Sequence, residues 1–172
     1  MMNAGLIEDS TRIWWDIRPS AKFPTLETRV MDVCTLVDDT VALAAYLVCM
    51  MRMLYRLRTN NQRWRIYTPM LINENRWRAM RYSFDEGLID LGKGRIVPFE
   101  ELLNEMLGLV AEDAEALGCA EEVNSLRHIL QRGTSAHRQL RKYELERAAG
   151  ASHDDALKAV VDKLINDTAE GL

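Results

Sequence analysis

Cysteine is scarce in this sequence of 172 residues, and its scarcity limits how the chain can be stabilised. The three cysteines, Cys34, Cys49 and Cys119, lie far apart and form no C-x-x-C pair. An odd and scattered set of this kind favours a reducing, cytoplasmic setting. A chain of this length can bury about two thirds of its unfolded surface, so its fold requires neither disulfides nor a structural metal.

Long apolar runs are also missing, and the first residues do not have the pattern of a secretory signal. The longest apolar stretch, residues 41–51, is about half as long as a membrane-spanning helix, and an arginine-rich run follows it. Glu8 and Asp9 stand where a secretory signal would carry basic residues. We therefore expect no membrane partner and no export.

The chain has no overall excess of positive charge. Its formal net charge is -4, from 22 basic and 26 acidic residues. Positions 52–81 nevertheless hold eight arginines and one acidic residue, whereas residues 98–172 hold 15 acidic and 8 basic side chains. The arginines could bind phosphates beside Trp64 and Trp77. Pairing with the acidic helices is the preferred interpretation, and we expect no nucleic-acid partner.

Two segments near the N-terminus alternate apolar and polar residues, as half-buried strands do. They are residues 13–18 (IWWDIR) and 25–33 (TLETRVMDV), and the breaker-rich PSAKFP separates them. Because side chains alternate with a period of two, Glu27 and Arg29 project from one face of the second strand. The pattern predicts a small antiparallel sheet with one charged face.

Glu27 and Arg29 are the residues most suited to chemistry. A carboxylate and a guanidinium on one strand face can hold a divalent metal ion and an anionic oxygen close together. Arg18 and Asp16 on the neighbouring strand could join them. From the residues alone, an ion-pair cluster on a solvated sheet face is the commoner interpretation, because such pairs are frequent and contribute little to stability.

Helical periodicity dominates after Cys34. We expect a long first helix that begins at Asp38 and Asp39 and ends in arginines, as the helix dipole favours. Pro69 should kink or interrupt the second helix. The expected helices cover residues 38–58, 62–81, 99–117, 119–131, 134–149 and 152–168, and a hairpin is expected within residues 87–98.

The fold class that follows is α+β, mostly helical with a small antiparallel N-terminal sheet portion. We expect a single domain over residues 1–172, in which residues 1–35 hold the strand pair and the candidate site and residues 36–172 form the helical portion. No self-contained active site emerges elsewhere. His128, His137 and His153 lack the spacing of metal ligands and are expected to be surface or hydrogen-bonded polar residues.

Three blocks of the sequence, read together, resemble a known family. They are IEDSTRIWWDIRPSAKFPTLETRVMDVCT, ENRWRAMRYSFDEGLID and RGTSAHRQL. Their order and spacing are similar to the C-terminal half of the type 2 glutamate-cysteine ligase or carboxylate-amine ligase family, within the glutamine synthetase superfamily. The resemblance covers nearly the whole chain and implies the C-terminal half of a glutamine synthetase-like ligase fold.

The activity that the resemblance implies is ATP-dependent ligation. Such enzymes phosphorylate a substrate carboxylate, typically the side chain of glutamate, and an amine then displaces phosphate from the acyl phosphate. By the match to the superfamily's Glu-x-Arg strand, Glu27 would bind Mg²⁺ on the ATP phosphates and Arg29 would neutralise the transferring phosphoryl group. Arg18, in the WWDIRPS block, is a candidate for binding a phosphate or the substrate carboxylate. Phosphoryl transfer relies on positioning, metal and arginine charge, which agrees with these residue types.

The same resemblance gives weaker candidates and some departures. Asn75, Arg76 and Arg81, in the NRWRAMRY segment, would line the same nucleotide site. Ser83 stands where family members carry glycine, so the local turn departs from the family pattern. Family enzymes are about twice as long, and their N-terminal half supplies further acidic metal ligands and much of the sheet.

Two classes of function are open from the sequence. The leading one is the C-terminal portion of a carboxylate-amine ligase that works in the cytoplasm as a homo-oligomer or with an N-terminal-half ligase subunit. The alternative is a non-catalytic binding or assembly module that retains the ligase fold and engages a partner through its sheet edge or helices. The sequence does not identify the acceptor amine.

Overall fold

The computed structural model describes residues 1–170, except for the side chain of Ser10. The chain divides into two compact units, Met1–Cys34 and Thr35–Leu172. We call them the strand unit and the helical unit and describe each by itself. The division falls one residue from the boundary expected between the strand pair and the helical portion. That the two form a single domain stays a prediction.

The strand unit is built on one antiparallel pair of short strands. Its elements are the 3-10 turns Met2–Ala4 and Ser10–Arg12 and the strands β1 (Ile17–Pro19) and β2 (Leu26–Thr28). Arg18 lies directly opposite Glu27 in the register. The side chain of Ser10 is not described, and none of the other residues of the strand unit is buried. The unit therefore has no apolar core of its own.

Both strands are shorter than the sequence pattern predicted. The strands expected over residues 13–18 and 25–33 are reduced to three residues each. Before β1, the Arg18 guanidinium donates to the carbonyls of Thr11 and Ile13, at 2.6 and 3.2 Å. These carbonyls are thus bonded by a side chain rather than by a neighbouring strand, and the alternating pattern there does not lead to pairing.

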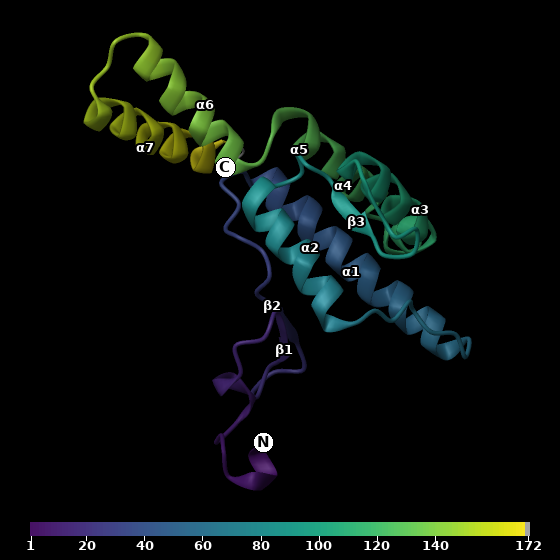
Figure 1. The fold of residues 1–172 in the computed structure, drawn as a ribbon. Helices are drawn as coiled ribbons and strands as arrows, with labels where there is room; N and C mark the ends of the chain where they lie inside the picture. Colours follow the sequence, from purple (N-terminus) through teal and green to yellow (C-terminus); the bar gives the residue numbers. More distant parts are fainter. Residues whose placement is uncertain (171–172) are drawn as a thin grey trace. The chain divides into compact units, whose positions relative to one another are not determined.

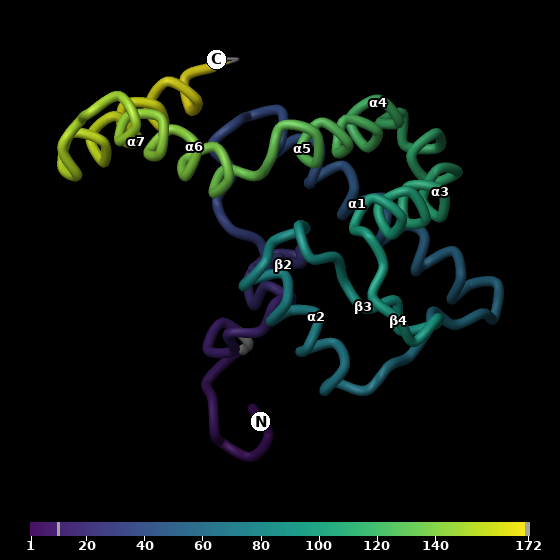
Figure 2. Tube along the Cα trace, turned by 45° about the horizontal axis from the view of Figure 1, so that its top comes forward, coloured from purple at the N-terminus to yellow at the C-terminus, as the bar shows by residue number. Residues whose placement is uncertain are grey.

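The helical unit contains seven helices and one hairpin within the described residues (Figures 1 and 2). In chain order they are α1 (Val37–Thr59), α2 (Pro69–Tyr82), β3 (Leu88–Asp90), β4 (Arg95–Val97), α3 (Phe99–Leu117), α4 (Ala120–Asn124), α5 (Leu126–Arg132), α6 (Ser135–Ala148) and α7 (His153–Ala169). Strands β3 and β4 pair antiparallel, and α6 and α7 lie side by side. The elements confirm the predicted α+β class, mostly helical with a small N-terminal sheet.

Two of the predicted helices need correction. The helix expected over residues 62–81 begins only at Pro69, so Pro69 interrupts it rather than kinks it. Proline has no backbone N–H to donate and fits the first helical turn. The helix predicted over residues 119–131 is two short helices, α4 and α5, which meet at Ser125. The side chains of Asn124 and Ser125 donate to carbonyls four and three residues earlier, at 2.8 and 2.7 Å. They compete with helical hydrogen bonds at this point.

The core of the helical unit lies where α1 packs against α3, α4 and α5. Buried residues of these helices form one apolar cluster, which comprises Ala42, Cys49, Met53, Leu107, Val110, Ala114, Val123 and Leu126. Asp113 of α3 is also buried, and Arg52 and Arg56 of α1 contact it at 2.5 and 2.8 Å. Arg65 pairs with Glu105 of α3 at 2.9 Å. These arginines pair with an acidic helix, as the sequence predicted.

Ser83 adopts a backbone conformation that suits glycine. It follows α2 with φ 54° and ψ -123°, where a side chain is strained. We expect Ser83→Gly to raise the free energy of unfolding by about 1 kcal/mol, measured by urea denaturation. Asn61→Gly, at φ 56°, is the control, because asparagine tolerates the left-handed region better. A loss of stability at Ser83, or an equal gain at Asn61, would contradict this account.

Candidate functional site

The strand-pair site expected from the sequence is assembled within the strand unit. Glu27 lies between two arginines: Arg18 Nε donates to Glu27 Oε2 at 2.6 Å, and Arg29 Nη2 lies 2.6 Å from Glu27 Oε1. The register sets Arg18 opposite Glu27, and the period of two returns Arg29 to the same face. Asp16 joins through its backbone, because its carbonyl accepts the Arg29 N–H at 2.7 Å.

Arg18 is held in place, whereas Glu27 and Arg29 stay accessible. The Arg18 side chain is 11% exposed, compared with 43% for Glu27 and 32% for Arg29. The Trp14 ring lies 4.6 Å from the guanidinium carbon of Arg29 and 5.9 Å from that of Arg18. Stacking on an aromatic ring orients a guanidinium and leaves its hydrogen-bond donors available. Of the two arginines, Arg29 is therefore the one that is accessible to a ligand.

Electrostatics keep the Glu27 carboxylate charged. The hydrogen bond from Arg18 holds the pKa of Glu27 below its ordinary value, and the charge of Arg29 acts in the same direction. The side chain is therefore ionised at neutral pH. One surface thus offers an anionic oxygen ligand beside an accessible guanidinium, which suits a cation and a phosphate or carboxylate bound side by side.

The residues that the structure describes do not form a cluster of acidic metal ligands. Among residues 1–170, no three histidine, cysteine or acidic side chains lie together in a way that could hold a metal ion. Both oxygens of Glu27 already contact arginines. Mg²⁺ takes six oxygen ligands in octahedral geometry, some of them from water and phosphate. Glu27 can supply one of these ligands, and the remaining positions require water, phosphate oxygens or further side chains.

The remaining candidates lie on α2, in the helical unit. Asn75 holds the hairpin, because its amide donates to the Ile89 carbonyl and its oxygen accepts the Ile89 N–H, both at 2.8 Å. Arg81 lies 5.5 Å from the centre of the Tyr82 ring, and Arg76 is exposed. A structural role for Asn75 is therefore clear, and its part in a nucleotide site, like that of the two arginines, stays a prediction.

His137 and His153 make hydrogen bonds and His128 is exposed, as expected. The Thr134 N–H donates to His137 Nδ1 at 3.2 Å, which closes a capping box at the start of α6. His153 Nδ1 lies 2.8 Å from the Tyr143 hydroxyl.

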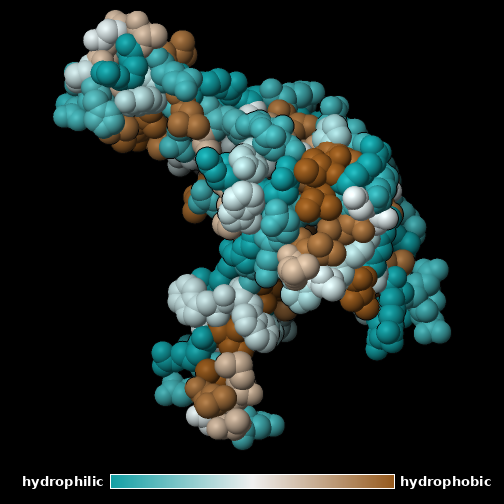
Figure 3. All heavy atoms as spheres, viewed as in Figure 1, coloured by the Kyte–Doolittle hydropathy of each residue, from teal (hydrophilic) through white to brown (hydrophobic). Residues whose placement is uncertain are grey.

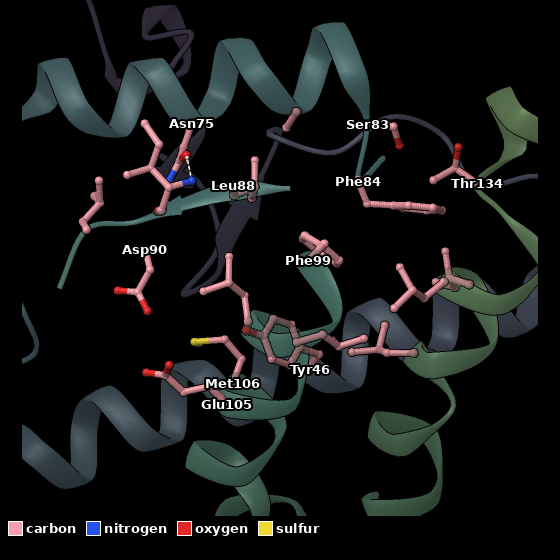
Figure 4. Close-up of a pocket in the computed structure, with 18 of the residues that line it drawn as sticks. Tyr46, Asn75, Ser83, Phe84, Leu88, Asp90, Phe99, Glu105, Met106 and Thr134 are labelled. Atoms are coloured by element: carbon pink, nitrogen blue, oxygen red, sulfur yellow. Dashed lines mark hydrogen bonds between the residues drawn. The ribbon is translucent and has the colours of Figure 1, made fainter. Parts of the chain in front are cut away.

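A cavity in the helical unit was not anticipated from the sequence. It has a volume of about 550 Å³ and lies between α1, α2, β3, α3 and α5 (Figure 4). Tyr46, Phe84, Leu88 and Phe99 contribute to its mostly apolar wall. Burial raises the pKa of Tyr46 to about 12, so its hydroxyl stays protonated. Apolar periodicity predicts which face of a helix turns inward, but it gives no signal of whether the space there is filled.

Comparison with known protein families shows to which family the chain belongs. Residues 1–163 match the family model described as glutamate-cysteine ligase family 2. Because the match covers most of the sequence, the chain belongs to this family. No solved structure matches the chain, so the likeness of its fold to glutamine synthetase-like ligases stays a prediction.

Similar proteins from several bacteria carry one name, "Putative glutamate--cysteine ligase 2". The one from Rhodospirillum rubrum is 59% identical over 172 residues, which is 100% of this chain and 44% of that protein. The one from Jannaschia sp. is 52% identical over 97% of this chain and 44% of that protein. The one from Chloroflexus aggregans is 41% identical over 100% of this chain and 42% of that protein. The chain thus spans less than half the length of these relatives.

Proposed function

We propose that this chain is the C-terminal portion of an ATP-dependent carboxylate-amine ligase of the glutamate-cysteine ligase type. Family membership supports a ligase. The observation that carries the proposal is Glu27 held between Arg18 and Arg29, within the residues that match the family. The enzyme would activate a glutamate-like carboxylate as an acyl phosphate, and an amine would then attack the acyl carbon and release phosphate.

The two arginines would have different roles in this reaction. Guanidinium groups stabilise charge that develops on phosphate oxygens in the transition state. Arg29, which is accessible beside Glu27, would contact the transferring phosphoryl group. Arg18 is largely covered and bonded to Glu27, so it would mainly hold that carboxylate in position. Glu27 would supply one ligand to the Mg²⁺ that accompanies ATP.

By itself, this chain would be an incomplete catalytic unit. Among the described residues, Glu27 is the carboxylate held between the two arginines, and no three metal-binding side chains lie together. The strand unit has no buried residue among those whose burial is described, which is typical of part of a larger sheet structure. Further ligands and strands would come from the portion of the family fold that this sequence does not span, either as an N-terminal-half polypeptide or through a homo-oligomer.

The test compares this chain with a joined protein, in which the part of the Rhodospirillum rubrum relative outside the matched region is linked to this chain. We expect the joined protein to form ADP from ATP only when glutamate and an amine such as cysteine are both present. The chain alone should form none. Turnover by the monomeric chain alone would contradict the proposal. A joined protein with a native circular dichroism spectrum but no turnover would favour the non-catalytic alternative.

A further inference from the structure

Helix α1 is apolar on two opposite sides. One side carries Ala42, Cys49 and Met53, which are buried where α1 packs against α3, α4 and α5. The opposite side is exposed, and only 17% of the helix's most apolar stretch is buried within the chain. A helix that is apolar all round normally lies in the interior of a larger body or in a membrane. The exposed side of α1 therefore needs a covering surface.

The exposed side forms one continuous stripe, which we call the α1 seam. It consists of Val41, Ala44, Val48, Met51 and Tyr55, spaced alternately by three and four residues. The four larger side chains are between 44% and 71% exposed. Alternating spacings of three and four are typical of a helix side that packs against another helix.

Charges at the two ends give the α1 seam a direction. Asp38 is exposed in the first turn of α1, and Arg58 is exposed in the last turn. Arg52 and Arg56 already pair with Asp113. A matching surface would be basic near Asp38 and acidic near Arg58. A helix that runs antiparallel to α1 has this arrangement, because helices favour acidic residues at their N-termini and basic residues at their C-termini.

We propose that the α1 seam is the surface on which the rest of the family fold packs, through an apolar helix antiparallel to α1. This inference rests on the proposed function, because the occupant is the part of the relatives that this sequence does not span. That part is more than half of the Rhodospirillum rubrum relative, since the chain covers 44% of it. It is long enough to cover a helix of 23 residues. Figure 3 shows hydrophobic side chains, in brown, at the surface of the helical unit.

The test measures how the full chain binds the separately produced part of the Rhodospirillum rubrum relative that lies outside the matched region. Val48→Asp introduces a charge in the middle of the α1 seam. We expect it to weaken binding by about thirtyfold or more, measured by fluorescence anisotropy. The interface would bury the unpaired carboxylate and remove its hydration. Val161→Asp on α7 is the matched control. Val161 is 54% exposed and Val48 is 55% exposed, so both changes remove the same accessible side chain.

A second measurement does not depend on how the aspartate variant folds. The thiol of Val48→Cys should react with a maleimide at least about tenfold more slowly when the partner polypeptide is bound, because the partner excludes solvent from the seam. The thiol of Val161→Cys should react at an unchanged rate. Peptide mass spectrometry distinguishes these sites from the native cysteines.

Several outcomes would overturn the inference. If the complex forms and Val48→Asp binds as tightly as Val161→Asp, the seam is not the interface, while the proposed function stands or falls separately on turnover of the joined protein. Failure of the unmodified chain to bind at tens of micromolar would also overturn it. A chain dimer that Val48→Asp dissociates would assign the seam to a second copy. Val48-dependent binding to phosphatidylcholine vesicles would assign the seam to a membrane. α1 as a whole is long and apolar enough for one, although its uninterrupted apolar run, residues 41–51, is not.

Discussion

Glu27→Gln should lower the glutamate-dependent turnover of the joined protein on the order of a hundredfold to a thousandfold. Glutamine keeps the shape of the side chain but removes the negative charge that Arg18 and Arg29 contact in the structure. It also removes the charge that a divalent cation requires. Turnover is measured as ADP formation at saturating ATP over a series of Mg²⁺ concentrations, and the variant should need more Mg²⁺ to reach half of its maximal rate.

Arg29→Lys separates the geometry of the site from its charge. Lysine keeps the positive charge but loses the planar pair of donors, so turnover should fall while the unfolding midpoint changes little. Thr28→Val, on the opposite face of β2, is the control and should leave turnover within about threefold. If Glu27→Gln and Arg29→Lys both behave like Thr28→Val in an active joined protein, the cluster is only a structural ion pair and the site assignment is wrong.

Asp113→Asn should lower the free energy of unfolding of the chain by about 2 kcal/mol. The Asp113 side chain is 0% exposed and contacts Arg52 at 2.5 Å and Arg56 at 2.8 Å. Asparagine keeps the volume but leaves both guanidinium groups without the charge that they pair with. The expected loss of stability is smaller than for a fully buried ion pair, because both arginines remain partly exposed to water. Urea denaturation followed by circular dichroism measures the difference.

Glu112→Gln is the matched control for Asp113→Asn. Glu112 is 69% exposed and lies 3.3 Å from Arg56, so its loss should cost less than about 0.5 kcal/mol. An equal effect of the two substitutions would contradict the role given to Asp113.

The pH dependence of the Asp113 effect has a defined sign. The hydrogen bond from Arg56, and then that from Arg52, hold the pKa of Asp113 below its ordinary value. The stabilisation is therefore present above the pKa of an unfolded aspartate, about 4, and is lost as the pH falls through the lower pKa of the folded state. The stability difference between the native chain and Asp113→Asn should shrink below pH about 4. A difference that grows in acid would contradict this assignment.

Features set by local sequence could be predicted well. α3 spans residues 99–117 as expected, because Pro98 precedes it and Gly118 ends it at φ 69°. The shared face of Glu27 and Arg29 was also predictable, since it depends only on the period of a strand. The pairing of Arg52 and Arg56 with an acidic helix followed from the uneven distribution of charge.

Features that depend on contacts distant in sequence could not be predicted. Before β1, the carbonyls of Thr11 and Ile13 accept hydrogen bonds from Arg18, and no local pattern encodes those bonds. The cavity beside Tyr46 depends on how five elements fill space. The sequence shows the α1 seam only as part of an apolar run. Periodicity indicates that a helix is apolar, but it does not show which neighbours cover each side of the helix.

Whether the joined protein activates a carboxylate by phosphorylation can be measured by isotope transfer. Glutamate labelled with ¹⁸O in its side-chain carboxylate is converted with ATP and the amine, and the released phosphate is analysed by mass spectrometry. We expect each phosphate to carry one oxygen from glutamate, because the amine displaces phosphate from an acyl phosphate. Product formation with unlabelled phosphate, or with AMP in place of ADP, would contradict it.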